Sequence, residues 1–298
     1  SRVAHSIIVS EGDVSTANCN PAGDLVAEGQ LDLPAHVGTL SATVKGSIEW
    51  VGRESIRPGD VILMNDPYVG GSHCQDMRTI KPVFWNGELV AFVLNSAHWS
   101  DAGGPVPGSF HTTAADAYGE ALYVTPVRLV REGELDEDVM RLVLRNVRVP
   151  ELTQGDIVGQ LAALEIGEGR LHGLLEKYGR GVIVQQMDDL ISYSERLLRT
   201  EFAQLVDGTY EFEDFVDFDP LGDRHTPIRV HVGLTIEGDR ATFDFSGCDP
   251  QARAAINSPR SMTRSACMIS LRNVFPHVPQ NEGIIRSIEL VLPEGLVV

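Results

Sequence analysis

The spacing of apolar residues changes several times along the chain, and each change marks a predicted element. In the first half, apolar side chains alternate in short runs bounded by turn residues or recur every three to four positions, the periods of strands and helices. The expected elements are two short strands within 3–30, a helix at 36–52, a buried strand at 61–64 and a hairpin with strands near 79–85 and 88–97. Asn86-Gly87 favours the type I′ turn that such a hairpin needs.

The second half begins with long helical stripes and ends in a strand-rich pattern. Helices are expected at 135–147, 151–178 and 182–206, then strands within 209–247, a helix near 260–274 and a last strand near 285–292. Residues 99–120 are irregular and rich in Gly and Pro, and a loop of that length is typically functional or disordered.

These elements predict a mixed α/β (α+β) fold with three regions. A site-bearing region is expected at 1–134, a helical region at 135–208 and a mostly β region at 209–298. The first residues lack an initiator Met and a signal-peptide pattern, and the last residues break off in a strand-like pattern. We therefore expect both ends to be truncated or processed.

Composition narrows the class of protein. Hydrophobic residues make up 43% and charged residues 22%, which is ordinary for a globular protein. A net charge of −18 argues against nucleic acid or an anionic membrane as the main partner. No apolar run approaches the roughly 20 residues of a membrane span. The four cysteines form no CxxC pair, so we expect reduced thiols and a cytoplasmic location.

Histidine and carboxylate side chains occur close to the predicted strands. His73 and Asp76 lie three residues apart in the loop after the strand at 61–64, so both can turn toward one cation. His98 lies at the end of the second strand of the expected hairpin and is followed closely by Asp101. Asp13 lies near the N-terminus. Imidazole nitrogen and carboxylate oxygen are the ligand set of Zn²⁺, Mn²⁺ or Fe²⁺. A metal site is one hypothesis, and a plain polar loop is the alternative.

Other polar residues allow both functional and structural interpretations. Glu120 is a candidate general base or a solvated carboxylate. His36 could lie in the site, but a capping or internally hydrogen-bonded side chain is the favoured interpretation, and Cys74 is interpreted as a small buried hydrophobe. The sequence contains neither a Walker A motif nor GxGxxG, so we recognise no nucleotide-binding motif.

Several motifs resemble, in the same order, those of the hydantoinase B/5-oxoprolinase family. NDPYVGGSH at 65–73, with Asp76 following, is similar to the family signature NDPYxGGTHxxD, and AHWSDAGG at 97–104 is similar to its AHxxDxGG motif. Shorter similarities occur at 107–108, 118–122, 146–150, 155–160, 251–257 and 279–283. The resemblance covers nearly the whole chain, although family members are usually much longer.

The resemblance implies the catalytic subunit of an ATP-dependent enzyme that acts on an activated carbonyl. It implies a divalent metal, zinc or manganese, held by His73, Asp76 and His98, with Asp13 as a further ligand. ATP would be bound by a hydantoinase A-like partner in a hetero-oligomer. That partner would phosphorylate the carbonyl oxygen of a small substrate. Glu120 or Asp101 would then move protons in the metal-assisted step.

The reaction that the resemblance favours is hydrolysis of a cyclic amide of the hydantoin, lactam or oxoproline type. In the hydantoinase branch the second motif commonly has a doubled His and the loop ends in EEG, whereas this chain has Trp99 and the segment 118–120, YGE. Carboxylation of a ketone therefore stays open as an alternative. A non-catalytic structural subunit is a third hypothesis, and the joint presence of His73, Asp76 and His98 argues against it.

Overall fold

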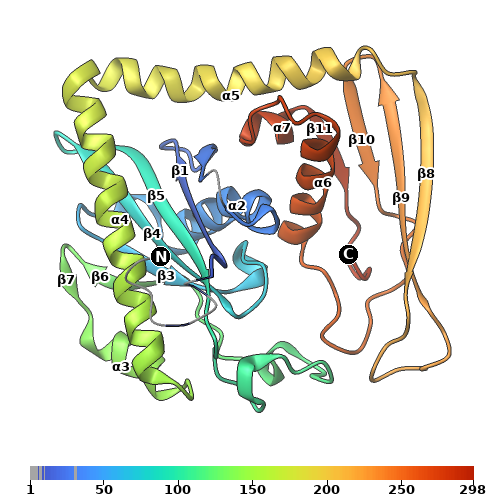
Figure 1. Cartoon of the computed structure of the whole chain (residues 1–298), viewed down its shortest axis with the longest axis horizontal. Coiled ribbons are helices and arrows are strands. Elements are labelled where there is room, and N and C mark those ends of the chain that lie inside the picture. The colour runs from blue at the N-terminus through green and yellow to red at the C-terminus, as the bar shows by residue number, and fades with distance from the viewer. Residues whose placement is uncertain (1–5, 7–8, 10, 30–31) are drawn as a thin grey trace.

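The computed structural model, which describes residues 6, 9, 11–29 and 32–298, contains two β-sheets joined by helices (Figure 1). The larger sheet has the strand order β2-β1-β5-β4-β3-β6-β7, and each neighbouring pair is antiparallel. Its strands are β1 Val14–Cys19, β2 Leu25–Glu28, β3 Val61–Met64, β4 Asp76–Trp85, β5 Glu88–His98, β6 Val127–Arg131 and β7 Glu134–Leu135.

The larger sheet is covered on both faces, because alternate side chains of its central strands are apolar in both directions. On β5, Ala91 and Val93 pack with apolar side chains of helix α4, Pro150–Tyr178. The intervening Phe92 and Leu94 pack in a second cluster with apolar side chains of helix α2, Pro34–Val51. A strand buried on both faces has the nearly continuous apolar sequence seen here.

The second sheet has the strand order β11-β10-β9-β8 and lies beyond α2 and α6 (Figure 1). Its strands are β8 Gly208–Val216, β9 Ile228–Glu237, β10 Arg240–Asp244 and β11 Ile288–Val291. The other helices are α3 Glu137–Arg145, α5 Arg180–Phe202, α6 Arg260–Val274 and α7 Glu282–Arg286. One apolar cluster joins Leu40 of α2, Met268 of α6 and Phe243 of β10, so a single core runs from the large sheet to the small one.

The mixed α/β prediction is confirmed, and the expected hairpin turn is present with φ of 50° at Asn86 and 83° at Gly87. Two elements differ from the sequence expectation. The strand expected at 285–292 is preceded by α7 and covers only Ile288–Val291. The hairpin β6–β7 was not expected, because β7 has two residues and gives no periodic signal.

The four cysteines are free and buried, as expected for structural thiols. Among the described residues, no helix combines the length and the apolar character needed to cross a bilayer.

Candidate functional site

Adjacent strands bring three of the predicted site residues together at one edge of the large sheet, where the strands β1, β4 and β5 begin or end. Asp76 is the first residue of β4 and His98 the last residue of β5, and the two pair directly in the antiparallel register. Asp13 precedes β1, and its carbonyl oxygen accepts a hydrogen bond from the His98 N–H at 3.1 Å. His73 reaches the same edge from the loop before β4. Side chains that are far apart in the sequence therefore meet because of strand order.

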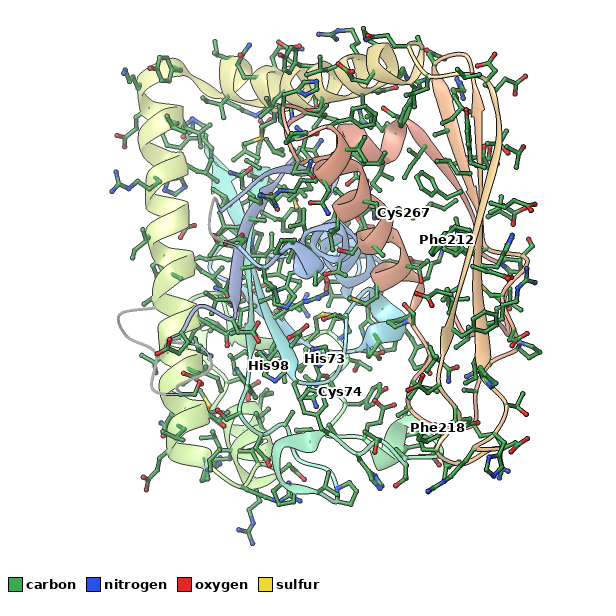
Figure 2. All side chains as sticks on the ribbon, turned by 45° about the vertical axis from the view of Figure 1, so that its right-hand side comes forward. His73, Cys74, His98, Phe212, Phe218 and Cys267 are labelled. Atoms are coloured by element: carbon green, nitrogen blue, oxygen red, sulfur yellow. The ribbon has the colours of Figure 1, made fainter. Side chains whose placement is uncertain are left out.

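The ligand atoms of His73, Asp76 and His98 are close enough to surround one ion, and those of Asp13, His36 and Asp76 form a second such group. Nε2 of His73 lies 3.3 Å from Asp76 Oδ2, and Nδ1 of His98 lies 3.4 Å from Asp76 Oδ1 and 3.8 Å from Asp13 Oδ2. In the group His73, Asp76 and His98, these atoms all lie within 4.8 Å of one another. Figure 2 shows the two imidazoles side by side, with ring centroids 5.0 Å apart.

Two carboxylate oxygens in this cluster have no hydrogen-bond donor among the described residues. Asp76 Oδ1 and Asp13 Oδ1 are both buried and accept no well-formed hydrogen bond, and their nearest imidazole nitrogens are His98 Nδ1 at 3.4 Å and His36 Nε2 at 4.0 Å. A buried oxygen of this kind is costly unless a donor or a cation compensates it. The donor set of two imidazoles and two carboxylates suits a divalent transition metal, so the residues present fit such an ion.

Gln75 determines which nitrogen of His73 faces the cluster. The Gln75 side-chain amide donates from Nε2 to the carbonyl oxygen of Ser109 at 2.7 Å, so its Oε1 is directed to His73 Nδ1, also at 2.7 Å. The proton of His73 is thereby placed on Nδ1, and the lone pair of Nε2 points toward Asp76. Histidine ligands of metals are commonly oriented by such a second contact.

His36 lies in the site, the location that the sequence analysis left open beside the favoured structural role. Its Nε2 is 3.1 Å from Asp76 Oδ2 and 4.0 Å from Asp13 Oδ1, and only 2% of the side chain is exposed. Ser15 Oγ accepts the Leu33 N–H at 3.2 Å and lies 2.9 Å from His36 Nδ1. Because the Asp76 carboxylate can only accept, His36 Nε2–H donates to it, and in a neutral ring the Ser15 hydroxyl then donates to Nδ1. The two interpretations are compatible, because His36 is hydrogen-bonded to Ser15 and also contacts Asp76 of the cluster.

The charge of Asp76 is stabilised from several sides. Burial alone would raise its pKa, but contacts with His36 and His98 outweigh burial and hold the pKa well below the usual range. Ser72 Oγ donates to Asp76 Oδ2 as well. The fully buried Arg78 donates to Ser72 Oγ at 2.8 Å, and burial lowers the pKa of Arg78 to about 10, so the guanidinium stays charged near neutral pH.

Asp101 organises the long loop. Its Oδ1 accepts the N–H groups of Gly103 at 2.9 Å and Arg148 at 3.1 Å. Its Oδ2 accepts the Gly108 N–H at 3.1 Å and the Arg148 guanidinium at 2.9 Å. Burial would raise the Asp101 pKa, but these donors together lower it. A carboxylate with both oxygens occupied is suited to positioning the loop and poorly suited to transferring protons.

Glu120 lies at the far end of that loop, in a partly buried position. Burial, and after it the nearby Asp116, raises the pKa of Glu120 above its ordinary value. The backbone of Glu120 packs against Gly104, where an added Cβ would lie 2.1 Å from the Glu120 oxygen. Within the described residues, no hydrogen bond or ion pair joins Glu120 to the histidines of the cluster.

Two further residues lie near the site: Phe110 was not singled out by sequence, and Trp99 was noted only as a departure from the family motif. Phe110, 66% exposed, lies against both imidazoles, with ring centroids 6.1 Å from His73 and 5.9 Å from His98. Trp99 is fully buried and donates from Nε1 to Gln160 Oε1 at 3.0 Å. Trp99 takes the place of the second histidine of the doubled pair, so this departure from the family motif changes a core position and not the ligand cluster.

Comparison with known proteins gives a consistent match. The sequence model of a family described as Hydantoinase B/oxoprolinase matches residues 1–298. The chain is 34% identical over 286 residues to the beta chain of the caprolactamase of Pseudomonas jessenii, covering 95% of this chain and 48% of that protein. It is 32% identical over 308 residues to one of the subunits of a putative D-/L-hydantoinase of a Pseudomonas species, covering 99% of this chain and 52% of that protein.

Solved structures show the same relationship. The crystal structure of the ATP-dependent caprolactamase from Pseudomonas jessenii matches with a TM-score of 0.89 and 32% identity, over 96% of this chain and 49% of that one. Acetone carboxylase in a nucleotide-free state matches with a TM-score of 0.92 and 23% identity, over 100% of this chain and 41% of that one, which shows a shared fold. The chain thus spans about half the length of these hydantoinase and caprolactamase relatives.

Proposed function

The chain belongs to the hydantoinase B/oxoprolinase family, and on this premise we propose that it is the metal-bearing catalytic subunit of an ATP-dependent enzyme that hydrolyses a cyclic amide. The observation that carries the proposal is the pair of buried, unpartnered carboxylate oxygens of Asp13 and Asp76 beside two imidazoles. A divalent cation held by Asp13, His73, Asp76 and His98 would act as a Lewis acid on the carbonyl oxygen and lower the pKa of the attacking water.

The protein's own residues supply binding, orientation and proton transfer. Gln75 orients His73 through Nδ1, and His36 with Ser72 fixes the position of Asp76. Phe110 covers the outer side of both imidazoles and would exclude water from the bound substrate. These contacts support a preorganised site, in which little rearrangement is needed when the substrate enters.

Glu120 is the residue that we propose to accept a proton from the attacking water. Its raised pKa brings it closer to neutral pH, where a carboxylate is a more effective base. Its loop is held beside the site by hydrogen bonds from the backbone N–H groups of Ala102 and Gly103 to Ser109 and Asp101. Asp101 is assigned the positioning of the loop.

The partner in this proposal is an ATP-binding protein of the hydantoinase A type, which activates the amide by phosphorylating its oxygen. Support comes from the relatives, two of which are named as single subunits of their enzymes, while a matching structure is called ATP-dependent. Ketone carboxylation receives no comparable support, because acetone carboxylase resembles this chain at the level of fold alone.

A turnover screen of the reconstituted two-component complex tests the function. Lactams, hydantoins, 5-oxoproline and ketones are supplied with ATP, with and without bicarbonate, and phosphate release and product are measured. The proposal expects ring opening of a cyclic amide that depends on ATP and on both components. Turnover of a ketone only in the presence of bicarbonate would replace hydrolysis by carboxylation. Substrate-dependent ATP hydrolysis by this chain alone would refute the two-component mechanism.

A further inference from the structure

Strand β8 is exposed along its whole length, although it carries three aromatic side chains. All nine of its residues are exposed, including Tyr210 at 49%, Phe212 at 68% and Phe215 at 52%. Figure 1 shows β8 at the outer edge of the small sheet, and Figure 2 shows Phe212 on this sheet and Phe218 beyond the end of the strand. Among the described residues, β9 is the only strand paired with it. One row of its backbone donors and acceptors is therefore available to another strand.

The apolar residues of β8 continue a face that the rest of the sheet buries. Tyr210 pairs with Leu234 of β9, and Phe212 pairs with Val232, so these side chains share one face of the sheet. Leu234 and Val232 pack against the core, whereas their neighbours on β8 extend past it. Large exposed aromatic side chains beside an open edge are typical of an interaction surface.

The same segment is strongly acidic. Residues 207–219 contain six carboxylates and no Lys or Arg: Asp207, Glu211, Glu213, Asp214, Asp217 and Asp219. Glu213 is paired with Arg229 at 2.7 Å, and Asp219 accepts backbone N–H groups of the neighbouring loops. Glu211 pairs with Gly233 of β9 and Glu213 with His231, so these two carboxylates lie on the face opposite to Tyr210 and Phe212.

We propose that β8 is a docking edge for an extended segment of a partner protein in which apolar residues alternate with Lys or Arg. Such a segment adds to the small sheet as a further antiparallel strand and covers Tyr210 and Phe212. Its basic side chains lie opposite Glu211 and Glu213, on the face away from the two aromatic residues. Opposite charges facing each other across strands are stabilising and like charges are destabilising. A second copy of this chain is disfavoured as the occupant, because pairing β8 with itself brings carboxylates against carboxylates.

The test uses a synthetic peptide with alternating Lys and Val residues, and a control peptide in which the same residues form a Lys block and a Val block. Binding is measured by fluorescence anisotropy at fixed salt, and hydrogen exchange locates the protected amides. The alternating peptide is expected to bind more tightly than the block peptide and to protect amides of β8. Equal binding of both peptides, or protection away from β8, overturns the proposal.

A charge-reversal pair tests the contribution of the acidic residues. Glu211→Lys with Glu213→Lys should weaken binding of the alternating peptide by about tenfold, the effect of roughly 1.4 kcal/mol. The control carries Glu151→Lys and Glu176→Lys on exposed positions of α4, which changes the net charge equally and should leave binding nearly unchanged. Equal weakening in both variants would show a non-specific charge effect and refute the docking edge. A dimer that protects β8 without peptide would assign the edge to a second copy and also refute it.

Discussion

At the scale of single residues, the site depends on how the two carboxylates are held. Asp76 is fixed by His36 and Ser72 on one oxygen, while its other oxygen and one oxygen of Asp13 are left without donors in the part of the chain that the structure describes. This arrangement separates the residues that would contact an ion from those that position the contacting groups. The separation leads to different expectations for the two kinds of residue.

His36→Ala should weaken the affinity for zinc or manganese without abolishing binding. The variant removes the Nε2–H that donates to Asp76, and loss of such an orienting contact typically lowers metal affinity by about 10- to 100-fold. Affinity is measured by competition with a chelator of known strength. His277→Ala, which removes a surface imidazole 53% exposed, is the matched control and should change nothing. Unaltered affinity in His36→Ala would remove His36 from the site.

Glu120→Gln and Asp101→Asn should be distinguishable by their pH profiles in the reconstituted complex. A base is active when deprotonated, so wild-type kcat/KM should fall as pH drops through the Glu120 pKa, which is raised above 4.5. Glu120→Gln should lower kcat by about 10²- to 10⁴-fold and remove this acidic limb.

Asp101→Asn should keep the acidic limb of the pH profile and lower the free energy of unfolding by about 1–3 kcal/mol, because the loop donors lose their acceptor. A lost limb in Asp101→Asn would instead identify Asp101 as the base.

Local sequence was informative about part of the site only. His73, Asp76, His98 and Asp13 could be proposed because each lies in a motif or beside a predicted strand end, and their role as ligands stays a prediction. His36 could not be placed by the same argument. It belongs to a helix whose contact with the sheet edge is made only in the folded chain.

At the scale of elements, the position of α2 between the two sheets depends on close helix contact. Gly38 of α2 lies against α6, where an added Cβ would lie 2.4 Å from Ser265 Cα. Ser265 Oγ also accepts the Gly38 N–H at 3.2 Å. Because the close atom belongs to the backbone, no side-chain rotation can relieve a clash there.

Gly38→Ala should therefore destabilise the fold by about 1–3 kcal/mol through overpacking. Gly169→Ala on α4 is the matched control, because an added Cβ there meets nothing within 4 Å. That control should be stabilising by about 0.5–1 kcal/mol, the usual gain for Gly to Ala in a helix. Urea unfolding measures both. Stabilisation in both variants would mean that α2 and α6 are not in the close contact described.

Glu28→Gln should change how stability depends on pH. Burial raises the Glu28 pKa to about 7, and Arg272 at 3.3 Å only partly opposes this effect. The pKa of Glu28 is higher in the folded state than in the unfolded state, so burial favours its protonated form. The contribution of this form to the free energy of unfolding is fully present below pH 4.5 and is lost as pH rises through about 7. The variant should thus be more stable than wild type at pH 8, by about 1–3 kcal/mol, and nearly equal at pH 4. A variant less stable at pH 8 would show that the Arg272 pair dominates.

Element prediction succeeded where the apolar period was long or a turn residue was specific. The hairpin β4–β5 was predicted from Asn86-Gly87, and the long helices α4 and α5 from their repeating stripes. The hairpin β6–β7 depends on pairing of β6 with β3, which lies more than 60 residues earlier. Such pairing leaves no local signal.

At the scale of the whole molecule, one core joins regions that the sequence suggested were separate. Leu40 and Phe92 lie in the same apolar cluster as Phe243, so the first and third expected regions share buried surface. The division at 1–134, 135–208 and 209–298 and the cytoplasmic location stay predictions. Periodicity identified both strand-rich parts, but the contact between α2 and α6 that joins them depends on Gly38 and on tertiary packing.

The central claim is that the cluster at the edge of the large sheet holds a divalent metal, and metal analysis tests it most directly. The purified chain and His98→Ala are compared by elemental analysis, and both are then unfolded after the metal has been removed. The account predicts about one zinc or manganese ion per wild-type chain and little in the variant. It also predicts nearly equal unfolding of the metal-free forms, because a ligand and not a core side chain is lost. Loss of a large core side chain would cost about 2–5 kcal/mol. A wild-type chain without transition metal, or a variant that retains all of it, would contradict the account.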